Sequence, residues 1–277
     1  MNILALGAHP DDIEIGCGGT LLKYARAGHG VYLMVLTDGA QGGSAKVRRD
    51  EQLASCRILG AKEIFWGGYQ DTEVPVTRQA IQQIEDVVKK IDPAFIFVNY
   101  FDDTHQDHRH LATCTVTATR YTRNVLFYET PTTQNFSPTV YVDIDGLLED
   151  KVRSLEVHAS QVQKTNVEGL SILEVARSSA HFRGIQGRVR AAEAFVSLRL
   201  FINVGADLVL ASRSSPIPAR RSARPKPRLW PRSFAAGGSL KVAKWRPSSE
   251  LWRRSPGRHR EWLSALARRR STWRSCR

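Results

Sequence analysis

The sequence predicts an α/β protein with a mostly parallel sheet flanked by helices, in a single domain that an irregular basic tail follows. Two observations support this fold class. Unbroken apolar runs at 2–8, 31–36 and 94–98 have the length of buried strands, and stretches of helical length separate them. Strands paired in parallel need such crossover helices, and because they are covered on both faces they lose the alternation of polar and apolar residues.

In the first half of the chain, capping and turn residues bound the expected elements. Apolar residues at helical spacing predict a helix over 19–26 that Gly28 ends. Gly42-Gly43-Ser44 opens a helix that runs to about 59, and a short strand is expected over 63–66. Thr77 can cap a helix over 77–91, which Pro93 ends.

The second half continues the same alternation of elements. A helix is expected from about 107 to 121, followed by strands over 125–128 and 139–144. Asp145 can cap an amphipathic helix over 146–159. A further helix over 168–181 and a strand-like segment over 194–200 complete the domain.

Polar clusters follow two of the expected strands. His9-Pro10-Asp11-Asp12 comes directly after the strand over 2–8, and His105-Gln106-Asp107-His108 follows the strand over 94–98. Ligands of open parallel sheets bind at the carboxyl ends of strands, beside the point where the strand order reverses. We therefore expect the two clusters to meet in space and form a site.

The residue types of these clusters predict a metal-dependent hydrolase. His9 and Asp12 can both point at one ion from a turn that enters a helix, and His108 can supply a third ligand. Two imidazoles and one carboxylate leave a position open for water, which is the pattern of catalytic zinc, although another divalent metal would also fit. Zinc lowers the pKa of its water from ~16 to about 7, which makes a hydroxide nucleophile available.

The remaining members of the clusters suit acid–base chemistry. Asp11 lies beside the ligands without being one, so it is the expected general base. His105, held by Asp107, is the expected imidazolium that stabilises an oxyanion and then protonates a leaving amine. Such a set is typical of amide or ester hydrolysis.

Simpler explanations exist for each residue taken alone. Asp11 and Asp12 could cap the following helix, and the histidines could be solvated loop residues. A phosphate cradle at Gly16-Cys17-Gly18-Gly19 is disfavoured because the spacing matches neither GxGxxG nor a P-loop. The occurrence of both clusters at strand ends favours the site.

The ordered motifs of the chain resemble those of the PIG-L/LmbE-like family of zinc-dependent N-acetylglucosamine deacetylases. The motifs span residues 1 to about 203, and single motifs are weak whereas the ordered set is specific. They are Ala8-His9-Pro10-Asp11-Asp12, Thr37-Asp38-Gly39, Arg48-Arg49-Asp50-Glu51 with Leu59-Gly60, His105-Gln106-Asp107-His108, His158-Ala159-Ser160-Gln161 and Ala192-Glu193-Ala194-Phe195.

This resemblance implies a Rossmann-like fold and removal of an acetyl group from a small amino-sugar substrate, such as a thiol-glycoside precursor of the N-acetylglucosaminyl malate type. It implies the same ligands, His9, Asp12 and His108, and the same roles for Asp11, His105 and Asp107. It adds Arg48 as a substrate-binding residue, with Arg49 as the alternative. Family members often form homo-oligomers and often have Tyr where Ala191 stands.

The charge of the chain is divided between two segments. The formal net charge is +13, yet residues 204–277 hold 16 Arg and 3 Lys against three acidic residues. Residues 1–203 have 21 basic and 24 acidic side chains, so the expected deacetylase domain is slightly acidic. We expect residues 204–277, which hold five of the six Trp, to be mostly disordered.

The charge division bears on the second function considered, nucleic-acid binding. An Arg-rich arm with interleaved Trp suits nucleic acid, but a scaffold domain of this class would not be acidic. The abrupt change at Val204 is also typical of a frameshift product, which is the explanation we favour for the tail. A related metal amidohydrolase with a non-sugar substrate is the third hypothesis.

Cysteine usage and hydropathy predict the compartment. Cys17, Cys56, Cys114 and Cys276 have no CxxC spacing, which indicates reduced thiols rather than disulfides or zinc knuckles. The first apolar run lacks a preceding basic region and is short, and no run approaches the ~20 residues of a membrane span. A cytoplasmic protein without membrane contact is therefore expected.

Overall fold

The structure, a computed structural model, describes residues 1–202. The prediction of a disordered tail over 204–277 therefore lies outside the described residues, as does Cys276. Within the described part, seven strands form one sheet in the order β3-β2-β1-β4-β5-β7-β6. The strands are β1 (Asn2–Gly7), β2 (Gly30–Thr37), β3 (Ala61–Tyr69), β4 (Phe95–Asn99), β5 (Val125–Tyr128), β6 (Val140–Asp143) and β7 (Ala192–Arg199).

The pairing of the strands confirms the predicted mostly parallel α/β fold. β3, β2, β1, β4 and β5 pair in parallel, whereas β7 is antiparallel to both β5 and β6. β1 lies between β2 and β4, so the chain leaves β1 toward one side of the sheet and later returns on the other side. The carboxyl ends of β1 and β4 therefore form the topological switch point at which ligands bind in such sheets.

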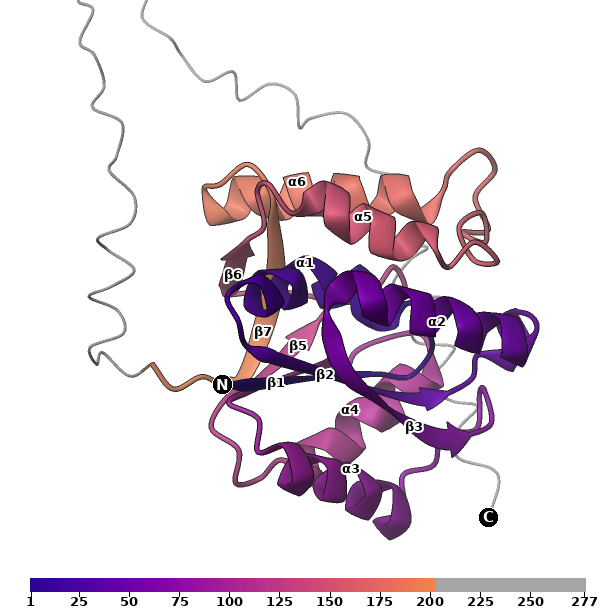
Figure 1. Ribbon diagram of the computed structural model, residues 1–277, viewed down its shortest axis with the longest axis vertical. Helices are drawn as coiled ribbons and strands as arrows, with labels where there is room; N and C mark the ends of the chain where they lie inside the picture. Colours follow the sequence, from indigo (N-terminus) through magenta and orange to yellow (C-terminus); the bar gives the residue numbers. More distant parts are fainter. Residues whose placement is uncertain (203–277) are drawn as a thin grey trace, which may run out of the picture. The chain divides into compact units, whose positions relative to one another are not determined.

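Six α-helices of the described residues cover the two faces of the sheet. Figure 1 shows α1, α2, α5 and α6 on one face and α3 and α4 on the other. None of these helices combines the length and apolar character that crossing a bilayer requires. The helices are α1 (Asp12–Arg26), α2 (Ala45–Leu59), α3 (Arg78–Ile91), α4 (Gln106–Ala118), α5 (Leu148–Glu156) and α6 (Ile172–Gly187), with a short 3-10 turn η1 (Ala40–Gly42) before α2.

Alternating residues of the strands build two separate cores. Leu4 and Leu6 of β1 pack with residues of α3 and α4 on one face. Ile3 and Ala5, which point to the opposite face, pack with residues of α1 and α2. Because both faces are covered, β1 is buried from Ile3 onward, which explains its unbroken apolar sequence.

The largest difference from the sequence-based elements is at the start of α1. The helix begins at Asp12, seven residues before the expected start at 19, so the glycine-rich run lies inside it. A Cβ atom on Gly16 would lie 2.0 Å from Cδ2 of Tyr128, and one on Gly19 would lie 2.9 Å from Cγ2 of Ile144. Glycine is needed here for close packing, which outweighs its low helix propensity.

A buried ion pair contacts the middle of α1. Glu193 of β7 accepts hydrogen bonds from the backbone N–H groups of Gly19 (2.8 Å) and Thr20 (2.7 Å). Lys151 of α5 donates to the Ile15 carbonyl (2.7 Å) and to Glu193 (2.6 Å). Both charged side chains are buried, so this pair ties α1, α5 and β7 together.

Replacing Lys151 by Met should destabilise the fold strongly. The substitution leaves the Glu193 carboxylate buried without its cation, which typically costs about 3–5 kcal/mol. Denaturant unfolding measures the effect. Arg153→Met is the control, because Arg153 pairs with Asp150 at the surface and should change stability little. Equal stabilities of the two variants would contradict a structural role for the Lys151–Glu193 pair.

Candidate metal centre and active site

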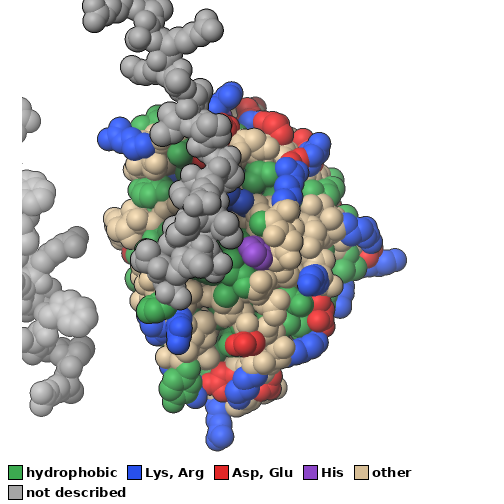
Figure 2. All heavy atoms as spheres, turned by 60° about the vertical axis from the view of Figure 1, so that its left-hand side comes forward, with side chains coloured by type: hydrophobic (Ala, Val, Ile, Leu, Met, Phe, Trp, Pro, Cys, Tyr) green, Lys and Arg blue, Asp and Glu red, His purple; other side chains and the backbone are tan. Residues whose placement is uncertain are grey.

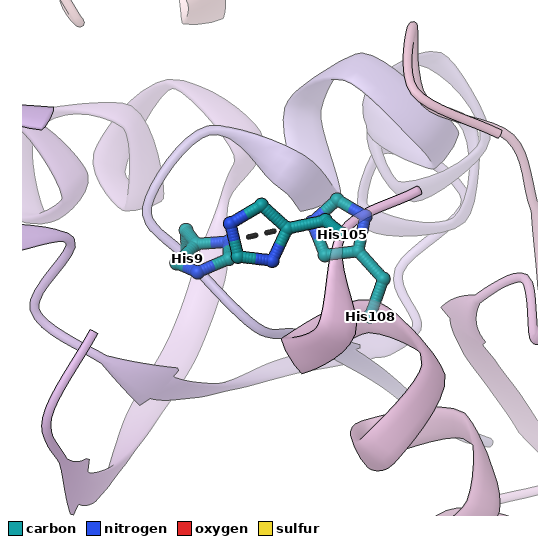
Figure 3. A group of neighbouring side chains, drawn as sticks. All are labelled: His9, His105 and His108. Carbon is teal, nitrogen blue, oxygen red and sulfur yellow. Dashed lines mark hydrogen bonds between the residues drawn. The ribbon is translucent and has the colours of Figure 1, made fainter. Parts of the chain in front are cut away.

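The two polar clusters predicted from the sequence lie next to each other at the switch point. His9 is in the turn after β1, and Asp12 is the first residue of α1. His105 is the N-cap of α4, and His108 lies in the first turn of that helix. β1 and β4 are adjacent parallel strands, so the segments that follow them converge. Figure 3 shows the three imidazole rings side by side, with the His9–His108 contact dashed.

Three atoms of the predicted metal ligands face one another. Asp12 Oδ2 lies 3.4 Å from His9 Nδ1 and 3.2 Å from His108 Nε2. The two ring nitrogens are 3.3 Å apart. All three residues are buried.

Neighbouring carboxylates fix which ring nitrogens carry lone pairs. His9 Nε2 lies 3.0 Å from Asp71 Oδ1 and 3.1 Å from Asp107 Oδ2, so these acceptors hold a proton on Nε2. His108 Nδ1 lies 3.1 Å from Asp103 Oδ2, which holds a proton on that nitrogen. Therefore His9 Nδ1 and His108 Nε2 are unprotonated in the neutral rings, and both lone pairs face Asp12. Carboxylates commonly orient metal-binding histidines in this way.

The spacing of the three atoms fits a tetrahedral metal site. Zinc bonds to His and Asp are ~2.0–2.1 Å long, and the edges of such a tetrahedron are ~3.3–3.4 Å. The observed distances of 3.2–3.4 Å match these edges. His105 also lies close to His9 and His108. A second group of possible ligands joins His9 with Asp71, His105 and Asp107. This set of imidazole and carboxylate donors can hold a metal ion.

The electrostatics of the cluster also favour a cation. Burial opposes charge on His108, yet Asp12 and Asp103 raise its pKa to about 9. Burial likewise opposes charge on His9, but Asp107, Asp12 and Asp71 raise its pKa well above the usual value. Burial would raise the pKa of Asp12, whereas His108 and His9 lower it well below its usual range. The cluster thus stabilises positive charge at its centre.

Asp11, the predicted base, is held in an unusual backbone conformation. Its φ of 92° lies in the left-handed region, which is uncommon for a residue other than glycine. Gln52 of α2 accepts a hydrogen bond from the Asp11 N–H at 3.2 Å, and Gln52 in turn donates to Glu14 at 2.7 Å. Burial raises the pKa of Asp11 to about 6, although Arg48 and His158 oppose the shift.

Arg48, the predicted substrate-binding residue, contacts the turn that carries Asp11. Its guanidinium donates to the carbonyls of Gly39 (2.8 Å) and Pro10 (2.6 Å) and to Asp11 Oδ2 (3.3 Å). Arg48 is buried and lines the central cavity. Through these contacts Arg48 stabilises the turn that carries Asp11. Its predicted contact with substrate stays a prediction. Its alternative, Arg49, stacks on Trp66, with 4.3 Å between the guanidinium carbon and the ring centre.

His105 differs from the expected imidazolium held by Asp107. The Asp107 carboxylate contacts His9 and accepts from the N–H groups of Thr72 (2.8 Å) and Val74 (3.1 Å). His105 Nδ1 instead accepts the backbone N–H of Asp107 at 3.2 Å, as an N-cap. Burial, His9 and His108 lower the His105 pKa. The lowered pKa favours the neutral ring, whose proton is on Nε2 because Nδ1 accepts the Asp107 N–H.

Several residues of the site were not found from the sequence. Asp71 and Asp103 orient the two histidines, and Gln52 holds Asp11. Asp71 lies in a loop, where the sequence offers no spacing signal. Asp103 belongs to the same strand exit as His105, so proximity to that cluster could have indicated it. Ala191, where relatives often have Tyr, packs with Ile144 and Val152 in a core cluster rather than at the site.

A cavity of about 520 Å³ surrounds the candidate ligands and Asp11. The segment between α5 and α6 forms part of its lining. Ser160 of this segment donates twice to Glu51, from its N–H (2.8 Å) and its hydroxyl (2.7 Å), and Gln161 donates to the Gly42 carbonyl (3.1 Å). Two motifs far apart in the sequence thus meet at the rim of the site.

Comparisons with known proteins identify the family to which the chain belongs. The family model described as PIG-L, GlcNAc-PI de-N-acetylase, matches residues 4–119. The uncharacterized deacetylase YaiS of Escherichia coli (strain K12) is 32% identical over 167 residues, which are 57% of this chain and 90% of that protein. Diacetylchitobiose deacetylase of Thermococcus kodakarensis is 30% identical over 192 residues, covering 57% of this chain and 69% of the enzyme.

A solved structure supports the same relationship. The N,N'-diacetylchitobiose deacetylase of Pyrococcus horikoshii, in complex with its inhibitor MPG, has a TM-score of 0.64 and 28% sequence identity. The match covers 75% of this chain and 88% of that protein. The chain therefore belongs to the PIG-L family, and its similar proteins include deacetylases.

Replacing Asp103 by Asn should weaken metal binding. The substitution removes the carboxylate that orients His108, and loss of such a partner typically lowers metal affinity about 10–100-fold. Zinc titration of the metal-free protein against a competing chelator measures the change. Asp102→Asn is the matched control, because Asp102 contacts Asn135 (2.9 Å) rather than a histidine. Unchanged affinity in the Asp103 variant would count against this geometry.

Proposed function

We propose that the chain is a zinc-dependent N-deacetylase that removes the acetyl group from an N-acetylglucosaminyl compound. The observation that carries the proposal is the set of three converging donor atoms on His9, Asp12 and His108, with Asp11 beside them in one cavity. Similarity to deacetylases of N-acetylated sugars supports the reaction class. We assign the activity to residues 1–203, the proposed deacetylase domain.

The donor set fits zinc, and another divalent metal could serve in its place. When bound, such an ion would polarise the acetyl carbonyl and lower the pKa of a water molecule. His9, Asp12 and His108 would hold it. Asp71, Asp103 and Asp107 would keep the two imidazoles in the ligating tautomers.

Asp11 is the proposed general base. Arg48 contacts Asp11 Oδ2, whereas Asp11 Oδ1 has no hydrogen-bond partner within residues 1–202. The free oxygen can accept a proton from water as the water attacks the acetyl carbon. Positioned bases of this kind contribute ~10²–10⁴-fold to rate.

His105 is the proposed hydrogen-bond donor to the oxyanion. The Asp107 N–H occupies its Nδ1, and its ring lies 4.5 Å from the His9 ring and 4.9 Å from the His108 ring between centroids. Its Nε2–H can donate to the oxygen on which negative charge develops. Cleavage of the carbon–nitrogen bond then yields acetate and an amine, and the proton taken up by Asp11 can return to the amine.

The charge pattern on one face of the described residues does not favour a nucleic-acid partner. Figure 2 shows Lys and Arg interspersed with Asp and Glu over the uncovered part of one face. The nucleic-acid alternative depends on residues 204–277, which lie outside the described part of the chain. Cytoplasmic location, lack of membrane contact and homo-oligomer formation also stay predictions.

The direct test of the proposal is amine release from a panel of N-acetylglucosaminides by the purified full chain. Metal analysis should find a bound divalent ion, removal with a chelator should abolish amine release, and zinc should restore it. Full activity in metal-stripped protein would refute the proposal. Activity limited to non-sugar amides would favour the third hypothesis instead.

Single substitutions of Asp11 and His9 should distinguish the role of the general base from that of a metal ligand. Asp11→Asn should retain the metal but lose ~10²–10⁴-fold in kcat, because the amide cannot take the proton. His9→Ala should lose the metal, because a ligand is removed. Metal content and kcat are measured on the same preparations. Normal turnover by the Asp11 variant would exclude this residue as the base.

Replacing Gln52 by Leu should lower kcat, because Gln52 helps to hold Asp11 in position. The substitution removes the acceptor of the Asp11 N–H, and small misplacements of reacting groups can cost up to about 10²-fold. Metal content and KM should change little, which separates this effect from a loss of folding. Ser55→Ala is the control, since it removes only a bond to Glu14. An unchanged kcat in the Gln52 variant would exclude this positioning role.

A further inference from the structure

One side of the central cavity is lined by aliphatic side chains that belong to none of the protein's core clusters. They come from α1, from the turn after β5, from the segment between α5 and α6, and from α6 itself. We call them the apolar wall, and they are Ile15, Pro131, Val167, Leu170, Ile172 and Val175.

The apolar wall is exposed to the cavity, and helix α6 fixes the position of two of its residues. Val167 is 56% exposed and the other members are half-buried or exposed. A capping box between Ser171 and Glu174 defines the first turn of α6, which places Ile172 and Val175 three residues apart on one face. Contiguous apolar surface left outside a core commonly marks a ligand-binding groove.

A second chamber of about 260 Å³ shares one end of the wall. Ile15, Thr130, Pro131 and Val175 line both cavities. The second chamber is lined further by four alanines of α6 and β7 and by the charged pairs Lys151–Glu193 and Arg183–Glu129. Because Ile15 and Val175 line both cavities, a group that lies against this end of the wall also borders the second chamber.

The cations that line the two cavities already have partners. Lys151 pairs with Glu193 (2.6 Å), and Arg183 holds Glu129 through two bonds of 2.5 and 2.6 Å. Arg48 donates to the Asp11 turn, and Lys164 donates to the Gly42 carbonyl. In the second chamber, where both cations are paired with carboxylates, a carboxylate or phosphate on the ligand would have to compete with these pairs, whereas an uncharged apolar group would not.

From the wall and the paired cations we infer that the substrate carries an uncharged apolar group, alkyl or aryl, on the side of the sugar away from the reacting acetamide. This inference rests on the proposed deacetylase function and selects among its open substrates. It disfavours the N-acetylglucosaminyl malate type, whose attached group is a dianion near neutral pH. The apolar group lies against Ile172 and Val175 and extends into the second chamber.

The test compares three substrates on the zinc-loaded full chain: octyl β-N-acetylglucosaminide below its micelle concentration, N-acetylglucosaminyl malate and free N-acetylglucosamine. Each methylene buried against the wall should tighten binding by about fourfold. KM for the octyl compound should therefore be lower than that for free N-acetylglucosamine by at least ~10-fold. Equal KM values, or preference for the malate compound, would overturn the inference and leave deacetylation intact.

Variants of the wall connect any preference to these residues. Val175→Asp should raise KM for the octyl compound by ~10-fold or more, and by a larger factor than it changes KM for free N-acetylglucosamine. Val175→Thr, which keeps the shape, should have a smaller effect. Ile185→Asp is the matched control, because Ile185 is on the same helix, is 71% exposed and lines neither cavity. Equal effects of the Val175→Asp and Ile185→Asp changes would overturn the inference.

Binding measured without turnover separates this inference from the proposed function. Octyl β-glucoside has the apolar group but no acetamide, so calorimetry with it reports on the wall even if no compound is deacetylated. Weaker binding to the Val175→Asp variant than to the Ile185→Asp variant supports the inference. A Val175→Asp protein that binds the glucoside normally but changes its oligomeric state would show that a second copy of the chain covers the wall, and would overturn it.

Discussion

The feature on which the site depends is a group of buried carboxylates around two buried imidazoles. Asp12, Asp71, Asp103 and Asp107 are all at most 6% exposed, and each contacts His9 or His108. Buried negative charge is costly unless it is paired and hydrogen-bonded. Hydrogen bonds from backbone N–H groups offset part of this cost. The negative charge that is left uncompensated favours a cation at the centre of the group. The turns after β1, β3 and β4 are therefore positioned by the same electrostatic requirement that prepares the site for a cation.

The strained conformation of Asp11 follows from this arrangement. His9 and Asp12 must both face the centre, so the turn between them has to bend sharply, and Asp11 takes a positive φ. Such strain persists only where the surroundings hold it in place. Arg48 holds the turn from one side, and Gln52 holds the Asp11 N–H from the other. Both come from α2, so the packing of this helix on α1 bears directly on the geometry of the candidate base.

The glycines of α1 allow this helix, which carries Asp12, to pack closely against its neighbours. Tyr128 and Ile144 approach the helix so closely at Gly16 and Gly19 that no larger residue fits. The close approach brings Glu193 and Lys151 within hydrogen-bonding distance of the α1 backbone. The helix that begins with Asp12 is thereby tied to β7 and α5. The segment after α5, which leads into the apolar wall, is connected to the candidate metal centre through this helix and through its bonds to Glu51 and Gly42.

The sequence alone determined the fold class and most of the candidate site. Unbroken apolar strands and helical crossovers allow few topologies, and the residues after β1 and β4 are local motifs that can be recognised in one dimension. The distribution of the carboxylates was decided by tertiary structure, because Asp71 and Asp103 lie in loops whose course depends on packing. The partner of Asp107 could not be predicted for the same reason. Its place near His105 in the sequence suggested that it holds His105, but its carboxylate contacts His9 in the structure. The helical state of the glycine-rich run was likewise not predicted from propensity, because the reason for its glycines is the close packing of Tyr128 and Ile144 in the folded protein.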